Sequence, residues 1–315
     1  MSVRLFFVRF CACCTFLLFF GCVVSPRYQS LVLEKAEIGP GGVSATWLGT
    51  AGILLSDGDT EILFDPYVSR NPYGWFPILS GQPIKSREAA VIASIRDLGM
   101  RNVEAIFVSH AHFDHSLDVP NFAKYTNARV LGSQSVQYIL EGSMIEGLKE
   151  VMVIEDGGCI TFGKFKIVFR LSDHGKPFLG QPFAPDNIEE ALKPGANAYD
   201  YRLGETFAAH VTHPNGSLIY NASAGWKETT FKGLKADVAI MALAGRTETK
   251  KYIESVAGEV GASRIIPVHF DYFLGEQTEE VRMFPNVQFS HFVDVAEKTL
   301  DGVTVDALPL SLIHI

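Results

Sequence analysis

The chain has 315 residues, of which 47% are hydrophobic, and its formal net charge is −8 at pH 7. This length and apolar content suffice for one large domain or two modest ones with a full core, so folding needs no metal as a staple. The acidic balance, with no basic stripe, argues against nucleic acid as the main partner.

Residues 1–22 are typical of a secretory signal, with two arginines, an apolar run that ends at Phe20, and then Gly21-Cys22. The run is shorter than the roughly 20 residues of a membrane span. Its end resembles a bacterial lipobox, in which the cysteine, here Cys22, is acylated and becomes the new N-terminus. We therefore expect a lipid-anchored protein of the bacterial cell envelope, on the periplasmic or extracellular side of the membrane. A simple cleaved signal and an uncleaved anchor are the alternatives, because Phe19 and Phe20 are bulkier than a lipobox prefers.

The remaining chain divides into a tether, a domain and a tail. Residues 23–42 end in Gly-Pro-Gly-Gly and are predicted to form a tether, and residues 43–309 form the folded domain. Residues 310–315 resemble the translation of a sequencing adapter and are set aside from the fold. Cys159 is the only cysteine after Cys22, so we expect no internal disulfide and a small buried side chain at this position.

Short predicted strands alternate with helices along the domain. Alternating or continuous apolar runs between Gly, Pro, Asn and Asp predict strands at 43–48, 52–55, 61–64, 103–108, 129–131, 151–154, 165–171, 206–211, 218–221, 238–243 and 264–268. Helical spacing predicts helices at 86–98, 133–140 and 248–260. The long loops 65–85 and 175–200 are rich in Pro and Gly, and the first also carries aromatic residues. Two similar halves, each beginning with strands, predict an α/β fold that forms a four-layer α/β/β/α sandwich.

The densest chemical signal is the stretch SHAHFDHSLD, which follows the predicted strand 103–108. In an extended segment residues two apart face the same way, so His110 and His112 can present their imidazoles to one ion. If the chain then turns, Asp114 and His115 can face a neighbouring ion. Three imidazoles and a carboxylate within six positions favour a metal site over a polar loop whose histidines only cap backbone groups.

The H-x-H-x-D-H pattern resembles the metallo-β-lactamase superfamily, and the resemblance extends from about Val43 to Phe273. The segment 46–52 is similar to the opening strand and glycine turn of that superfamily, and Phe64-Asp65-Pro66 to the strand end before the metal loop. The segment IIPVH, which ends at His269, favours the branch that contains L-ascorbate-6-phosphate lactonase and N-acyl-phosphatidylethanolamine phospholipase D.

The resemblance implies two sets of metal ligands. The first set is His110, His112 and His174, and the second is Asp114, His115 and His269. Asp114 and His269 are also the candidate catalytic residues. The implied cofactor is Zn²⁺, as one or two ions, with Mn²⁺ or Fe²⁺ as alternatives. His210 and His213 lie near a predicted hairpin turn, and either is an alternative to His174.

The sequence departs from the family pattern at residues 220–225, which read YNASAG. Family members place there an aspartate that bridges both metals, whereas this chain offers Ser223 or, less fittingly, Asn221. Without that anionic ligand the site is expected to hold either one metal or two metals bridged only by hydroxide.

Four further residues are candidates for supporting roles. Asp65 and Asp118 are placed to accept hydrogen bonds from ligand imidazoles. Asp271 and Tyr272 follow His269 and are candidates to protonate a leaving group or orient substrate. For all four, an ordinary loop hydrogen bond is the alternative.

The resemblance implies a hydrolase that uses metal-bound hydroxide on an ester, lactone, amide or phosphodiester substrate, because a metal lowers the pKa of bound water to about 7. Loops 65–85 and 175–199 are expected to wall the pocket, and their aromatic residues favour a small-molecule or lipid-like substrate. Two other functions stay open, an iron-dependent oxygenase of the same fold and a non-catalytic metal-binding lipoprotein.

Overall fold

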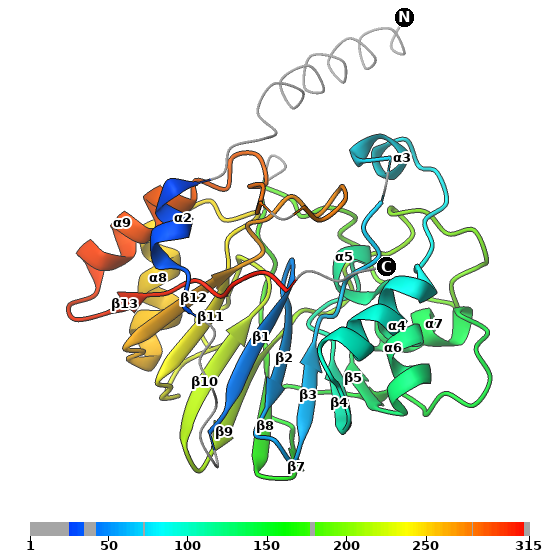
Figure 1. The fold of residues 1–315 in the computed structure, drawn as a ribbon, viewed down its shortest axis with the longest axis horizontal. Helices are drawn as coiled ribbons and strands as arrows, with labels where there is room; N and C mark the ends of the chain where they lie inside the picture. The colour runs from blue at the N-terminus through cyan, green and yellow to red at the C-terminus, as the bar shows by residue number, and fades with distance from the viewer. Residues whose placement is uncertain (1–24, 35–41, 72, 177–179, 279, 312–315) are drawn as a thin grey trace, which may run out of the picture.

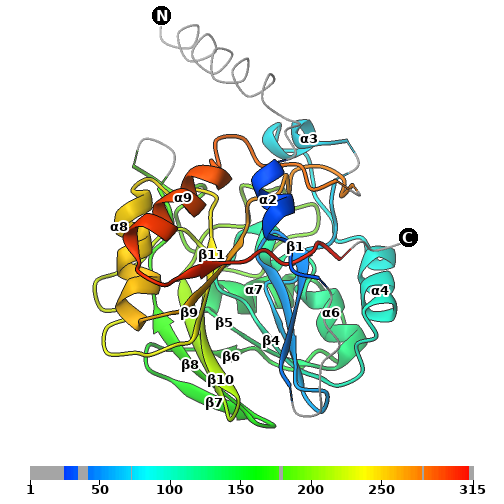
Figure 2. The ribbon, with the colours of Figure 1, turned by 60° about the vertical axis from the view of Figure 1, so that its left-hand side comes forward.

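The computed structural model describes residues 25–34, 42–71, 73–176, 180–278 and 280–311 (Figure 1). The expected signal segment 1–22 lies outside the described residues. Two sheets face each other in the middle of the molecule, and helices cover the outer face of each sheet (Figures 1 and 2). The predicted four-layer α/β/β/α sandwich is therefore confirmed.

The first sheet has its strands in sequence order. They are β1 (Ser44–Gly49), β2 (Gly52–Ser56), β3 (Glu61–Phe64), β4 (Val103–Phe107), β5 (Arg129–Gly132) and β6 (Met152–Val153). The pairs β1–β2 and β2–β3 are antiparallel, and the pairs from β3 to β6 are parallel. Parallel neighbours end at the same edge of a sheet, so the loops after β3 and β4 meet there.

The second sheet repeats this plan. Its order is β13 (Thr304–Val305), β12 (Arg264–Val268), β11 (Val238–Ala242), β10 (Gly216–Asn221), β9 (Phe207–His213), β8 (Phe165–Leu171) and β7 (Cys159–Phe162). Strands β7 to β10 pair antiparallel, and β10 to β13 pair parallel. Each half of the chain thus begins with an antiparallel meander and continues as a parallel sheet with helical crossovers.

The helices form the two outer layers. The helices on the first sheet are α4 (Glu88–Asp97), α5 (Phe113–Ser116), α6 (Val119–Thr126) and α7 (Gln134–Gly142). Those on the second sheet are α2 (Pro26–Leu31), α8 (Thr249–Ile253) and α9 (Phe289–Thr299). Helix α8 continues as a π-helical turn, Glu254–Gly258. A short helix, α3 (Trp75–Leu79), stands apart at the top of the molecule (Figure 1). Within the described residues, no helix is long and apolar enough to span a bilayer.

The core between the sheets is apolar and aromatic. Phe107 on β4 stacks against Phe169 on β8 with ring centroids 5.9 Å apart, and Phe64 packs on Tyr220 at 4.9 Å. These four rings are fully buried and join the two sheets. Burial of this apolar surface, which needs no metal, is the main force that holds the sandwich together.

Three sequence-based expectations about the flanking segments and Cys159 are wrong in part. Within the expected tether, residues 26–31 form α2, because Ser25 caps the helix and the buried Tyr28 packs on Phe270 at 5.3 Å. Within the expected tail, Leu310 bridges to Trp47 and packs on the core, while residues 312–315 lie outside the described residues. Cys159 is exposed, because it lies on the edge strand β7.

Candidate metal centre

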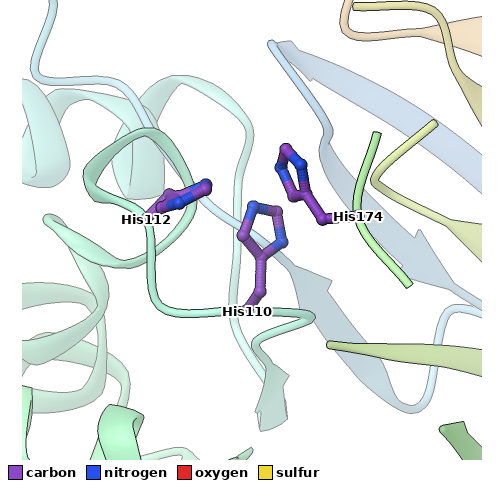
Figure 3. A group of neighbouring side chains, drawn as sticks. All are labelled: His110, His112 and His174. Atoms are coloured by element: carbon purple, nitrogen blue, oxygen red, sulfur yellow. The ribbon is translucent and has the colours of Figure 1, made fainter. Parts of the chain in front are cut away.

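The structure brings all six predicted ligand residues together, although they come from distant parts of the chain. They form two groups, and within each group the potential ligand atoms lie within 4.8 Å of one another. The first group is His110, His112 and His174, whose imidazoles converge in Figure 3. The second is Asp114, His115 and His269.

Backbone carbonyls fix the ring orientation of two histidines in the first group. His112 donates from Nε2 to the Phe183 carbonyl at 2.7 Å, and His174 donates from Nδ1 to the Gly175 carbonyl at 2.6 Å. Because a carbonyl can only accept, the opposite nitrogen of each neutral ring keeps its lone pair. His110 contacts Ser109 Oγ through Nδ1 at 2.9 Å, and its buried Nε2 has no hydrogen-bond partner among the described residues. Each ring thus keeps one nitrogen for a ligand.

Burial keeps these imidazoles neutral. It lowers the pKa of His112 to about 4 and that of His174 to about 3. Burial, together with the neighbouring histidines, also holds the pKa of His110 well below its usual range. Near neutral pH the first group therefore offers three uncharged nitrogen donors, the form that binds a metal.

The second group combines two imidazoles with a carboxylate. His269 Nε2 lies 3.2 Å from Asp114 Oδ2, and His115 Nε2 lies 3.8 Å from the same oxygen. Burial alone would raise the pKa of Asp114, but His115 and His269 lower it, so this residue stays an anion. Burial would lower the pKa of His115, but Asp114 and Asp65 outweigh it and raise that pKa. The group is thus held together by charge as well as by packing.

Asp65 supports this group from behind. Its carboxylate accepts hydrogen bonds from the Ser109 backbone N–H at 2.7 Å, from Ser109 Oγ at 2.5 Å, from His115 Nδ1 at 2.9 Å and from the Tyr220 hydroxyl at 2.9 Å. The bond to Nδ1 directs the other nitrogen of His115 toward Asp114 and fixes its tautomer. Asp65 therefore accepts a hydrogen bond from a ligand imidazole, as expected from the sequence.

Asp118 does something different from the role that the sequence suggested. Its carboxylate accepts from the backbone N–H groups of Val68 and Ser69 at 2.7 Å, and from the hydroxyls of Ser69 and Ser86 at 2.5 Å. No ligand imidazole is among these donors. Asp118 therefore folds the loop that follows Asp65 and does not orient a histidine directly.

A buried ion pair positions His269. The backbone N–H of His269, which has φ +54°, donates to the Thr50 carbonyl at 2.7 Å. The Thr50 N–H in turn donates to Asp271 Oδ1 at 2.9 Å, and Arg70 donates to Asp271 Oδ2 at 2.8 Å. Both carboxylate oxygens of Asp271 thus accept hydrogen bonds that fix the Thr50 backbone and Arg70. This arrangement counts against the expected role of Asp271 as a proton donor.

The other alternative residues lie apart from the two groups. His210 donates to the Lys235 carbonyl at 2.8 Å, and His213 lies 3.3 Å from Asp57, so neither replaces His174. Tyr272 stacks with Phe284 and lies under the Arg282 guanidinium.

Ser223, at the position where the family pattern has a bridging aspartate, lies beside Asp173, the residue before His174. Its hydroxyl donates to the Asp173 carbonyl at 2.9 Å, and the Asn221 amide donates to the Ser223 carbonyl at 2.9 Å. A Cβ on Gly225 would come within 2.5 Å of the Asp173 and His174 backbone, so this segment packs tightly against the His174 turn. The two ligand groups therefore share no carboxylate among the described residues.

Three buried imidazole nitrogens lack a hydrogen-bond partner in the described part of the chain: His110 Nε2, His115 Nε2 and His269 Nδ1. A buried polar atom without a hydrogen-bond partner is energetically unfavourable unless another group, such as a metal ion, binds to it. Three nitrogens in one group, and two nitrogens with one carboxylate in the other, are donor sets that suit a divalent transition metal. The residues present fit one or two such ions.

Sequence reasoning missed two contributors. The single hydroxyl proton of Tyr220 is shared between Asp65 and the Ala51 carbonyl, and the Phe183 carbonyl fixes the His112 ring. Tyr220 gives a weak signal as an aromatic hydroxyl near the end of a predicted strand. Phe183 gives none, because it lies in a long loop and acts through its backbone.

Replacing Asp65 by Asn should lower the affinity for metal about 10- to 100-fold. All four groups that face this carboxylate are donors, and the amide nitrogen of Asn cannot accept from any of them. Titration of metal-free protein with Zn²⁺ against a competing chelator measures the change. Asp57→Asn is the matched control, because Asp57 is a buried acceptor at the opposite end of β3. Equal affinity in the two variants would contradict the supporting role of Asp65.

Comparison with known proteins agrees with this geometry. The family model of the metallo-β-lactamase superfamily matches residues 45–220, more than half of the chain. A UPF0173 metal-dependent hydrolase of Ruegeria pomeroyi is 24% identical over 230 residues, which cover 72% of this chain and 85% of that protein.

Solved structures share the fold. Igni18, a metallo hydrolase of the archaeon Ignicoccus hospitalis, matches with a TM-score of 0.53 and 14% identity, over 85% of this chain and 96% of that chain. CmlA, a diiron β-hydroxylase of Streptomyces venezuelae, matches with a TM-score of 0.51 and 14% identity, over 87% of this chain and 54% of that chain. Because the family model matches more than half of the chain and the curated relatives are metal-dependent hydrolases, the chain belongs to the metallo-β-lactamase superfamily, as a metal-dependent hydrolase.

Proposed function

We propose that this hydrolase cleaves an ester, lactone, amide or phosphodiester bond at a Zn²⁺ centre held by the six converging residues. The observation that carries the proposal is that three segments far apart in sequence, residues 110–115, His174 and His269, form two adjacent ligand groups. A polar loop with histidines as caps would not need partners from the other sheet. The resemblance to the lactonase and phospholipase branch favours a lactone or a phosphodiester as substrate.

A divalent metal bound here would supply hydroxide at neutral pH and polarise the acceptor oxygen of the substrate. The chain's own residues would orient the water molecule and limit other water near the ligands. Asp114, whose pKa is lowered, stays an anion that can orient a water molecule by accepting a hydrogen bond from it. The ring of Phe273 packs on His269 with centroids 4.9 Å apart, and Phe183 packs on His112 at 5.8 Å. These apolar side chains limit water around the ligand histidines, which strengthens electrostatic interactions there.

His112→Ala should abolish turnover and reduce metal content, while the fold measured by circular dichroism is kept. The test is a panel of lactones, phosphodiesters, N-acyl amides and β-lactams, assayed with Zn²⁺, Mn²⁺ and Fe²⁺ and again after chelation. His210→Ala is the matched control, because this histidine lies outside both ligand groups. Turnover that survives in His112→Ala, or in chelated protein, would refute the proposal.

An oxygenase is the second candidate, because Asp114, His115 and His269 are the two-histidine, one-carboxylate set that also binds iron. Metal analysis of protein purified without added metal, combined with oxygen uptake, separates the two functions. Bound iron together with substrate-dependent oxygen uptake would favour the oxygenase.

The site is proposed to hold one metal tightly in the three-histidine group and a second one weakly. Ser223 supplies no bridging anion, so the Asp114 carboxylate of the second group would be the only charged ligand available to two cations among the described residues.

Ser223→Asp should therefore increase the amount of metal retained after dialysis from about one ion to about two per chain, the number that a bridged site holds. Plasma mass spectrometry of dialysed protein measures the ratio. Asn215→Asp adds the same charge at the exposed β9–β10 turn and should leave the ratio unchanged. Two ions retained by the unmodified protein would refute this proposal.

We also propose that a lipid on Cys22 tethers the protein to the envelope membrane. The support is the apolar run before Gly21-Cys22. Labelling of cells with radioactive palmitate should mark the protein, and Cys22→Ser should remove the label. Cys159→Ser is the control, and label that persists in Cys22→Ser would exclude the lipobox.

A further inference from the structure

We propose that an aromatic rim beside the metal centre docks on an anionic lipid bilayer and receives an amphiphilic substrate from it. The aromatic rim consists of Tyr73, Trp75, Phe76 and Tyr199. The substrate class rests on the proposed hydrolase function, whereas the docking surface does not depend on it.

Large apolar side chains on the rim face solvent. Tyr73 is 82% exposed, Phe76 58% and Tyr199 41%, and Trp75 is half-buried with its ring edge-on to Phe76 at 5.9 Å. Exposed clusters of this kind mark interaction sites, and Trp and Tyr in particular favour the boundary between water and lipid. The short helix α3 that carries two of them is fixed from below by the buried Ile78.

The rim connects to the first ligand group through a chain of contacts. The Tyr199 hydroxyl donates to the Leu79 carbonyl at the end of α3, at 3.0 Å. The Tyr199 ring packs on Phe183 at 5.0 Å, and Phe183 packs on the His112 ring and accepts its hydrogen bond. Backbone pairing of Pro83 with Asn197 joins the two loops that form this side. Aromatic surface thus runs from the outside of the molecule to a candidate metal ligand.

The loop after His269 reaches the same rim. A Cβ on Gly275 would lie 3.7 Å from the Gly74 Cα, so this loop touches the start of α3. From the same loop, the Phe273 ring packs on His269 at 4.9 Å and on Phe113 at 6.5 Å. The start of α3 therefore contacts the loop beside the second ligand group, as its end contacts the loop beside the first.

The charge of the segment that carries three of the four rim residues suits an anionic membrane. The segment 66–87 contains Lys85 and Arg87 and no Asp or Glu, and its third basic residue, Arg70, is buried and paired with Asp271. Lys85 is exposed and Arg87 is half-buried. Basic residues beside interfacial aromatic residues are attracted to anionic headgroups. The segment that carries these three rim residues thus has basic but no acidic side chains, which favours its approach to an anionic surface.

The described chain starts at the end of the molecule that carries the rim. Both views place α2 and α3 at the top, with α6 well below (Figures 1 and 2). Ser25 comes just before α2 and follows Cys22 by three residues, which can span at most about 11 Å. An anchor on Cys22 would hold this same end toward the membrane.

Quenching of Trp75 fluorescence by spin-labelled lipid tests the docking. The full-chain protein is mixed with vesicles of phosphatidylethanolamine and phosphatidylglycerol that carry doxyl-labelled lipid. The signal of Trp75 is the difference between the unmodified protein and Trp75→Phe. The control places a tryptophan at Tyr125 in the Trp75→Phe background, because Tyr125 on α6 is 40% exposed but lies away from the rim. We expect several-fold stronger quenching at Trp75 than at position 125, and weaker quenching when phosphatidylcholine replaces phosphatidylglycerol.

Equal quenching at the two positions, or none at Trp75, would overturn the proposal. The Tyr73→Ser/Phe76→Ser variant should reduce the quenching of Trp75, and if its only effect is to break a dimer seen by analytical ultracentrifugation, the rim is a contact between copies and the proposal fails. His112→Ala should dock as the unmodified protein does, so loss of catalysis and loss of docking are distinguishable.

A second experiment tests the substrate class. Tyr73→Ser/Phe76→Ser should slow hydrolysis of a vesicle-embedded substrate several-fold more than hydrolysis of its water-soluble short-chain analogue. Equal slowing of the two reactions would refute the substrate class.

Discussion

The Asp65 carboxylate is the interaction on which the arrangement of this protein depends. It stands at the end of β3 in the first sheet, yet one of its donors is Tyr220 on β10 of the second sheet. A carboxylate buried in this way is costly unless every nearby polar group donates to it, and four hydrogen bonds meet that condition. Burial and the neighbouring Asp65 carboxylate raise the pKa of Tyr220 well above its usual range, so the phenol keeps the proton that it donates. One anion thereby joins both sheets to His115.

Backbone geometry at two strand ends also fixes the positions of the side chains at the site. Asp65 and His269 both adopt a positive φ, +41° and +54°, directly after β3 and β12. Such a conformation is strained for a residue other than glycine and persists when its surroundings fix it. The groups that fix these backbones are the Phe107 carbonyl, which accepts from the Asp65 N–H at 2.9 Å, and the Thr50 carbonyl, which accepts from the His269 N–H at 2.7 Å. Sharp turns at these points let two strands of different sheets deliver side chains to one place.

The sequence predicts the ordered parts of this picture because periodicity and local ligand spacing are local properties. All of the strands expected from alternation are present, and the histidines after 103–108, 165–171 and 264–268 meet because those strands end at one edge of the sandwich. Helix α9 was missed, as was α6, because short amphipathic stretches beside polar loops give a weak pattern. The roles of Asp118 and Asp271 could not be read from sequence, since each depends on which distant backbone N–H groups the fold brings near.

The missing bridging carboxylate makes the outer anions more important in this chain. Asp114 is the only negatively charged residue in the two ligand groups, so a bound cation is neutralised incompletely by its direct ligands. Asp65 lies one hydrogen bond behind His115 and raises the basicity of that imidazole, which strengthens its attraction for a metal. Arg70 is a buried cation, but Asp271 accepts its hydrogen bond at 2.8 Å and compensates its charge within the same pair. The field at the ligands is therefore set mainly by Asp114 and Asp65, and both contact His115. The charge of the second site therefore depends mainly on the two carboxylates that contact the His115 imidazole.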